Sequence, residues 1–261
     1  MGEVGRGSRW LDLLTGGLLV LLLWQLLATL AHTPALPPPL AAIAAFFRLI
    51  GREMGWHLLV SLWRVVASLA LGSVTGVPLG LYLGRQERPD RPGARPSALA
   101  RLLLPVVFLV YPIPKVVLLP VVVVLLGVGD LAKIFLITLI IFFQILVTAR
   151  DAAREINPLL VLSMRSLGAS EWELYRHVVF PASLPKLFTA LRISLGTAVA
   201  VLFFSETFAT TKGIGYFVVD MLSRLAYAPM FAGVMAMGLL GFLLYLLLDW
   251  LEAWLCPWAD R

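Results

Sequence analysis

Charge, cysteine and histidine are all scarce in this sequence of 261 residues. Charged residues make up 14% of the chain, against about 25% in an ordinary soluble domain, while 60% of the residues are hydrophobic. The single cysteine, Cys256, excludes an intrachain disulfide and a CxxC metal site. The three histidines are not spaced as HExxH, which leaves little to hold a metal. We therefore expect a membrane protein with no metal and no cofactor, and a soluble enzyme is excluded.

Motifs for nucleotide binding and catalysis are missing as well. The chain has no GxxxxGKS/T phosphate loop, so any ATP hydrolysis would need a separate subunit. Neither GxSxG nor HExxH occurs in the apolar runs, which counts against a membrane-embedded enzyme. The net charge is +6. In so apolar a chain, a basic excess is typical of loops that set membrane orientation rather than of nucleic-acid binding.

Six apolar runs approach the length of about 20 residues that a helix needs to cross a bilayer. They cover residues 11–31, 58–83, 102–128, 132–149, 187–208 and 231–251. The third run contains Tyr111-Pro-Ile-Pro-Lys115 and Pro120, which predicts either a broken helix or a span preceded by a short helix. A broken helix at membrane depth must be covered by protein or by a water-filled cavity. The pattern predicts an all-α membrane protein, a polytopic bundle of six transmembrane helices.

The charges between these runs predict the orientation. Most of the lysines and arginines outside the runs lie on the side that carries both termini, so we expect the termini and the loops 84–101 and 150–186 to be cytoplasmic. Residues 84–101 are rich in arginine and proline, which is typical of a solvated connector. The predicted order is a cytoplasmic tail (1–10), a first transmembrane anchor (11–31), an extracytoplasmic interfacial segment with a short helix (32–57), a core of five transmembrane helices that includes the loop 150–186 (58–251), and a cytoplasmic tail (252–261).

The loop before the fifth run has clear internal order. Asn157-Pro158 predicts the start of a short helix, and Gly168 stands where a left-handed residue would end it. Ser170-Glu-Trp-Glu173 is a capping box that predicts a second short helix. We expect Pro181 and Pro185 to end that helix before the fifth run. Spacing alone leaves two roles open, a hairpin that only packs on the bundle and a knob that transmits motion from a soluble partner.

Ionisable residues inside the predicted spans are expensive and mark functional candidates. Arg64 and Arg192 lie near the ends of their spans, so their guanidinium groups can alternatively extend to the interface. Lys115 lies in the proline-broken segment, where a cation facing a cavity could attract an anionic solute. Glu206 lies near the outer end of the fifth span, where pairing with Lys212 is the simpler alternative.

The fifth span is the most polar of the six. Its small hydroxyl residues either line a pathway or pack against another helix, and the sequence does not decide between the two. The residues predicted for a translocation path are Lys115, Ser194, Thr197, Ser205 and Glu206.

One spacing in the loop resembles a known family. Gly168 is followed by nine residues and then by Val178-Val-Phe-Pro181, which resembles the EAA loop of permease subunits of binding-protein-dependent ABC importers. The loop pattern of that family is E-A-A, three residues, Gly, nine residues and I-x-L-P. Further stretches resemble its nitrate/sulfonate/taurine branch, in sequence order: Leu36-Pro-Pro-Pro39, Ser61-Leu-Trp-Arg-Val65, Gly76-Val-Pro-Leu-Gly80, Tyr111-Pro-Ile-Pro114, Ala190-Leu-Arg-Ile193, Ser205-Glu206 and Gly213-Ile-Gly-Tyr216.

The resemblance implies a type I importer permease in the inner membrane that forms a homodimer. It also implies two cytoplasmic ATPase subunits that receive the EAA loops, and an extracytoplasmic solute-binding protein. The solute would be a small organic anion, a sulfonate, taurine or nitrate. An ion-coupled secondary transporter is the alternative that the broken helix also fits, but the EAA-like loop does not fit it.

The coupling loop departs from the family pattern at one position. The place of E-A-A is taken by Leu162-Ser163-Met164, so the acidic residue is missing. Arg165 or Glu171 would then have to make the polar contacts with the ATPase. The residues that the resemblance assigns to coupling are Leu162, Ser163, Met164, Arg165, Gly168, Ala169, Ser170, Glu171 and Pro181.

Overall fold

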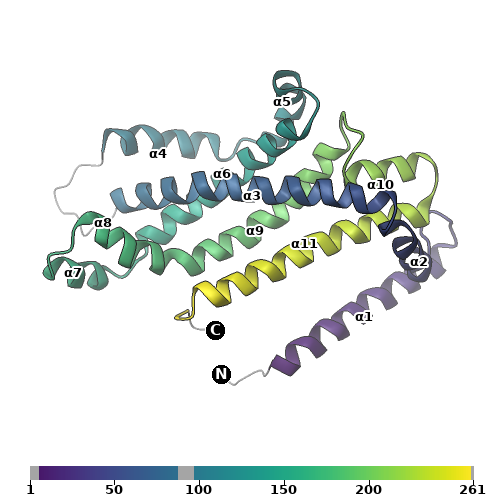
Figure 1. The fold of residues 1–261 in the computed structure, drawn as a ribbon, viewed down its shortest axis with the longest axis horizontal. Coiled ribbons are helices and arrows are strands. Elements are labelled where there is room, and N and C mark those ends of the chain that lie inside the picture. The colour runs from purple at the N-terminus through teal and green to yellow at the C-terminus, as the bar shows by residue number, and fades with distance from the viewer. Residues whose placement is uncertain (1–5, 88–96, 260–261) are drawn as a thin grey trace.

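The computed structural model describes residues 6–87 and 97–259, and every regular element among them is a helix (Figure 1). The first helices are α1 (Arg6–Ala31), α2 (Pro39–Ile50) and α3 (Glu53–Gln86). A bent pair follows, α4 (Ala98–Val110) and the short η1 (Lys115–Leu118) with α5 (Leu119–Leu126). The remaining elements are α6 (Asp130–Arg154), α7 (Pro158–Ser166), α8 (Glu171–Leu174), the π-helical turn η2 (Tyr175–Val179), α9 (Phe180–Glu206), α10 (Ile214–Ser223) and α11 (Tyr227–Leu255).

The predicted spans are confirmed in type and number. Five helical stretches are long and apolar enough to cross a membrane, and a sixth is obtained if the bent pair counts as one span. The axes of α4 and of η1–α5 meet at 89°, which confirms the break expected at the prolines. The short helix expected within residues 32–57 is α2. Half of the predicted connector 84–101, residues 88–96, lies outside the described residues.

Close packing of α3 on α6 forms the centre of the bundle, with α9 against both. Gly72, Gly76, Gly80 and Gly84 recur every fourth residue and therefore share one face of α3. That face lies against α6 so closely that a Cβ at Gly72 would be 3.0 Å from Ile141 Cγ1. A Cβ at Gly80 would be 2.7 Å from the Ala149 Cβ and would also strike a main-chain carbonyl of α6. Small residues thus let two backbones touch, as is typical of helices in lipid.

We expect Gly80→Ala to destabilise this helix pair. Although alanine favours a helix more than glycine does, the added methyl group must push α3 and α6 apart, and overpacking of this kind costs about 1–3 kcal/mol. Thermal unfolding of the detergent-solubilised protein measures the effect. Gly238→Ala is the matched control, because a Cβ at Gly238 meets nothing within 4 Å. Equal melting temperatures for the two variants would contradict the close approach.

The expectation that Pro181 and Pro185 end the second short helix is wrong. The chain stays helical from Glu171 to Glu206. Pro181 lies in the first turn of α9, where its missing N–H costs little, and the preceding turn is π-helical, a wider turn that accommodates irregular hydrogen bonding. Pro185 lies inside α9. The coupling loop is therefore continuous with a membrane helix.

Two elements stand out from the predicted plan. Helix α10 was not predicted, because its ten residues are too few to cross a bilayer. It packs against α11 and α9.

Helix α1 lies apart from the bundle (Figure 1). Its Trp24 reaches the rest of the chain, with the ring 5.4 Å from that of Phe231 and Nε1 donating to the Pro37 carbonyl at 3.0 Å. The other described side chains of α1 are largely exposed.

Candidate functional site: a helical loop, an ion-pair cluster and a hollow

The helix caps and the glycine turn of the loop between α6 and α9 form as the sequence predicts. The Asn157 side chain accepts a hydrogen bond from the Leu159 amide at 2.9 Å and caps α7. Gly168 has φ +80°, the left-handed conformation expected at the end of that helix. The Ser170 hydroxyl accepts from the Glu173 amide while the Glu173 carboxylate accepts from the Ser170 amide, so the capping box is confirmed. This hydrogen bond lowers the pKa of Glu173.

The loop buries one side and exposes the other. Val161 and Leu174 lie in an apolar cluster with the ends of α3 and α6, and Met164 packs against it. The exposed fractions of Leu162, Leu167 and Trp172 are 61%, 82% and 70%. Large apolar side chains that stand free at an end of the bundle where charged residues gather are typical of a surface that another protein covers.

Several predicted coupling residues have contacts inside the chain. Arg165 and Glu171 are brought together, with Nη2 2.8 Å from Oε1. The Ser163 hydroxyl donates to the Leu159 carbonyl in its own helix. Ala169 is half-buried and its amide donates to the Met164 carbonyl at 3.2 Å, while Pro181 lies in the first turn of α9.

The beginning of the loop is tied to α9. Glu155 follows the last residue of α6, and its carboxylate pairs with the Lys186 ammonium in α9. The hydrogen bond from Lys186 lowers the pKa of Glu155. Because Glu155 is exposed, this pair contributes little to stability but fixes where the loop leaves the bundle.

An ion-pair cluster lies at the end of the bundle opposite the loop. Arg64 of α3 is buried and donates from Nη1 to the Glu206 carboxylate at 2.7 Å. Its Nε and Nη2 donate to Asp130 Oδ1, at 2.9 and 2.6 Å. The Ser61 hydroxyl also reaches Glu206, at 2.8 Å. We call Ser61, Arg64, Asp130 and Glu206 the ion-pair cluster.

Both alternatives considered for these residues are wrong. The Arg64 guanidinium is buried rather than extended, because its side chain is only 2% exposed and donates both to the buried Glu206 and to Asp130, which is 49% exposed. Glu206 is fully buried and binds Arg64 rather than the Lys212 side chain. Lys212 takes part through its carbonyl, which accepts from Arg64 Nη1 at 3.0 Å. Asp130 and Glu206, the two acidic partners of Arg64, lie on helices far from α3 in the sequence, so residue spacing could not predict these pairs.

Glycines allow the turn after α9 to close over Glu206. Gly213 has φ +116°, and a Cβ there would strike the Glu206 carboxylate. The Gly215 amide donates to that carboxylate at 2.9 Å, and the Ile214 amide donates to Ser61 at 2.8 Å. The Gly213-Ile-Gly-Tyr216 stretch noticed in the sequence is therefore a backbone cradle for one carboxylate. Sequence reasoning missed Ser61, Asp130 and the neighbouring buried Lys133.

A hollow of about 370 Å³ lies beside the helix break, lined by Tyr111, Lys115, Phe143 and Gln144 among others. The Lys115 ammonium donates to the carbonyls of Val110, Tyr111 and Ile113 at 2.9, 2.9 and 3.2 Å. It also lies 4.6 Å from the centre of the Phe143 ring. These carbonyls belong to the end of α4, so the cation caps that helix. The charge is thereby fixed in the wall of the hollow.

The other predicted path residues lie in different places. Thr197 is joined to the hollow, because Gln144 Nε2 donates to its hydroxyl at 3.2 Å. Ser194 and Ser205 are buried inside the bundle, and Ser205 donates to the Leu202 carbonyl at 2.9 Å. Glu206 belongs to the ion-pair cluster. The structure therefore places Lys115 in the wall of the hollow and Thr197 beside it through Gln144, whereas Ser194, Ser205 and Glu206 do not line the hollow.

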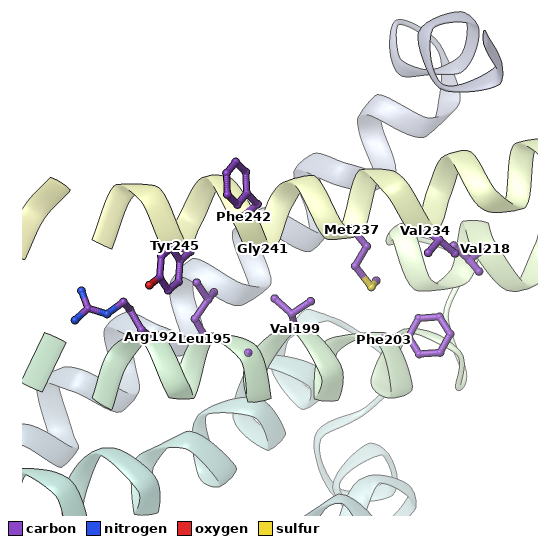
Figure 2. A pocket seen from close by; sticks show the side chains of 12 residues that line it. Arg192, Leu195, Val199, Phe203, Val218, Val234, Met237, Gly241, Phe242 and Tyr245 are labelled. Atoms are coloured by element: carbon purple, nitrogen blue, oxygen red, sulfur yellow. The ribbon is translucent and has the colours of Figure 1, made fainter. Parts of the chain in front are cut away.

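A larger groove of about 690 Å³ runs between α9 and α11 (Figure 2). Its lining is almost entirely apolar, with Val199, Phe203 and Met237 along it and Arg192 at one end. The Arg192 guanidinium pairs with Glu252 and lies 3.7 Å from Asp249, so its charge is balanced within the chain. Within residues 6–87 and 97–259, no group of three His, Cys, Asp or Glu side chains could hold a metal ion.

A bundle of apolar helices with a broken span and a helical loop at one end defines a polytopic helical membrane protein. Comparison with known proteins gives its family. The model of the family described as "Binding-protein-dependent transport system inner membrane component" matches residues 76–256. The chain belongs to this family, and it is a multi-pass importer permease of the inner membrane.

Individual relatives agree with this assignment. The taurine transport system permease protein TauC of Escherichia coli K12 is 32% identical over 260 residues, which cover 96% of this chain and 91% of TauC. The putative aliphatic sulfonates transport permease protein SsuC of the same organism is 29% identical, with 85% of this chain and 82% of SsuC covered. A structure of the MetNI methionine ABC transporter has the same fold, with a TM-score of 0.65 at 24% identity over 76% of this chain and 94% of that one.

Proposed function

We propose that two copies of this chain form the translocation path of an ABC importer for a small organic anion of the sulfonate type, driven by separate cytoplasmic ATPase subunits. The observation that carries the proposal is the loop α7–Gly168–α8. It stands at one end of the bundle, exposes apolar side chains and continues without interruption into α9. A force applied to the loop is therefore applied to a membrane helix.

The solute class is supported by the hollow and by the relatives. The hollow contains one fixed cation, Lys115, beside the aromatic ring of Phe143 and the amide of Gln144. Because the three ammonium donors of Lys115 are already engaged by carbonyls, the cation acts through its charge rather than by binding the solute directly. The names of TauC and SsuC refer to taurine and aliphatic sulfonates, which are small and carry a sulfonate anion.

The exposed face of α1 is available to lipid or to a second copy. This helix is apolar over 18 residues and its side chains there are unburied within the protomer, so it must lie against lipid or another chain.

The orientation is supported by the charges near α7 and α8, since arginine-rich loops face the cytoplasm. Both termini are then cytoplasmic. An extracytoplasmic solute-binding protein would deliver the solute at the end that carries the ion-pair cluster.

Reconstitution tests this function directly. The chain is purified from its native membrane in detergent, and the co-purifying subunits are identified. The complex is then reconstituted into liposomes, with ATP on the side of the membrane that corresponds to the cytoplasm. We expect an ATPase and a solute-binding protein to co-purify, and ATP-dependent uptake of a labelled sulfonate. A chain that purifies alone and transports without ATP would instead be an ion-coupled secondary transporter.

Two variants of Lys115 test the anion path in the same assay. Removing one unit charge about 7 Å from an anion costs about 2 kcal/mol at an effective dielectric of about 20. We therefore expect Lys115→Met to lower the uptake rate at least tenfold at saturating binding protein. Lys115→Arg keeps the charge and should retain most of the rate. An unchanged rate in the methionine variant would remove Lys115 from the path.

A further inference from the structure

Arg165 and Glu171, the two charged residues assigned to coupling, have partners within the protomer. Besides its 2.8 Å contact with Arg165, Glu171 lies 3.6 Å from the guanidinium of Arg85, at the end of α3. The Arg85 side chain is only 6% exposed. A buried arginine needs counter-charge, and Glu171 supplies part of it. Glu171 thus links α7 to the end of α3, because it contacts Arg165 in the first of these helices and Arg85 in the second.

The position of the missing acid is apolar and open. Leu162 stands where the resemblance would place a glutamate, and its side chain points out of the fold. Exposed large apolar side chains also occur at Leu159, Leu160, Leu167 and Trp172, beside the small exposed side chains of Ser163 and Ser166. The side chain of Glu173 serves the capping box. Arg165 and Glu171 pair with each other although the Glu171 side chain is 55% exposed, and the largest exposed side chains of the loop are apolar.

We propose that Arg165 and Glu171 are positioning residues that hold α7 against α8 and α3, and that the surface offered to the ATPase is the apolar one centred on Leu162. The inference rests on the proposed function. The ATPase would then have a groove lined by apolar side chains, and no lysine or arginine of that groove would contact the side chain of Leu162. Affinity then comes from apolar burial, and the ion pairs keep the loop in one orientation.

The surroundings of the loop favour a protein partner over lipid. Glu155, Arg154 and Lys186 lie beside the loop and expose about half or more of their side chains, which indicates contact with water. Apolar side chains that stand in water gain by being covered.

Binding of the purified ATPase subunit to the detergent-solubilised permease tests this inference. Leu162→Glu restores the acid of the family pattern, and Leu162→Met is the matched apolar control. Because a carboxylate entering an apolar groove loses its hydration, we expect Leu162→Glu to weaken binding at least tenfold and Leu162→Met to leave it within twofold. Wild-type binding should change little between 50 and 500 mM salt, concentrations at which the Debye length falls from about 14 to about 4 Å.

Glu171→Gln separates positioning from docking. We expect binding of the ATPase to stay within twofold, while the solute imported per ATP hydrolysed falls about threefold, a change in the range of one partly exposed ion pair. Arg165→Lys keeps the charge and should retain the coupling ratio. Tighter binding by Leu162→Glu, or binding by wild type that falls steeply with salt, would overturn the inference. Failure of the wild-type protein to bind any ATPase would refute the proposed function instead.

Discussion

Arg64→Met should leave little folded protein. Arg64 is the cation for two carboxylates, and the one on Glu206 is fully buried. Methionine fills a similar volume but leaves that carboxylate without its charged partner, and breaking a buried ion pair in this way costs about 3–5 kcal/mol. Such a loss is a large part of the net stability of a domain, about 5–15 kcal/mol. The yield of monodisperse protein in detergent and its melting temperature measure the effect.

Two comparisons make this prediction specific. Arg192→Met removes another membrane arginine, but its partners Glu252 and Asp249 are 21% and 41% exposed, so we expect a loss of about 1 kcal/mol or less. The double variant Arg64→Met with Glu206→Met removes both members of the buried pair and should be more stable than Arg64→Met alone. If Arg64→Met and Arg192→Met have the same melting temperature, the ion-pair cluster does not stabilise the bundle.

The cluster also shows what the sequence could not reveal. Apolar runs predicted the helices, because the bilayer demands about 20 apolar residues for each span whatever their neighbours are. Arg64, Asp130 and Glu206 stood in the sequence as isolated charges, separated by 66 and 76 positions. Their pairing depends on how α3, α6 and α9 pack, and helix packing has no local signal. Arg64 therefore looked like a residue that could reach the interface.

Local chemistry explains both the success and the error in the coupling loop. The caps at Asn157 and Ser170 and the turn at Gly168 were predicted correctly, because each depends on hydrogen bonds within a few residues. Pro181 and Pro185 were read by the same local rules, and the prediction failed. A π-helical turn before Pro181 lets the helix continue, and such turns follow from tertiary packing rather than from a residue pattern.

Gly168→Val should uncouple transport while the protein stays folded in the membrane. A Cβ at Gly168 meets nothing within 4 Å, so space is not the obstacle. The obstacle is φ +80°, which costs an L-residue about 1–2 kcal/mol and is an outlier for a β-branched side chain. The strain is relieved by changing the turn, which rotates α7 relative to α8. Since the chain is helical from Glu171 to Glu206, a misplaced loop no longer directs force along α9.

Solute-stimulated ATP turnover in proteoliposomes measures this uncoupling, and we expect at least a tenfold fall for Gly168→Val with a melting temperature close to wild type. Gly168→Asn is the matched control, since asparagine enters the left-handed region more readily than other residues and should keep most of the stimulation. Gly51→Val controls for the bulk of the new side chain, because Gly51 has a negative φ and open space around it. Stimulation that survives in Gly168→Val would mean that the turn does not transmit force, and that α7 moves independently of α9.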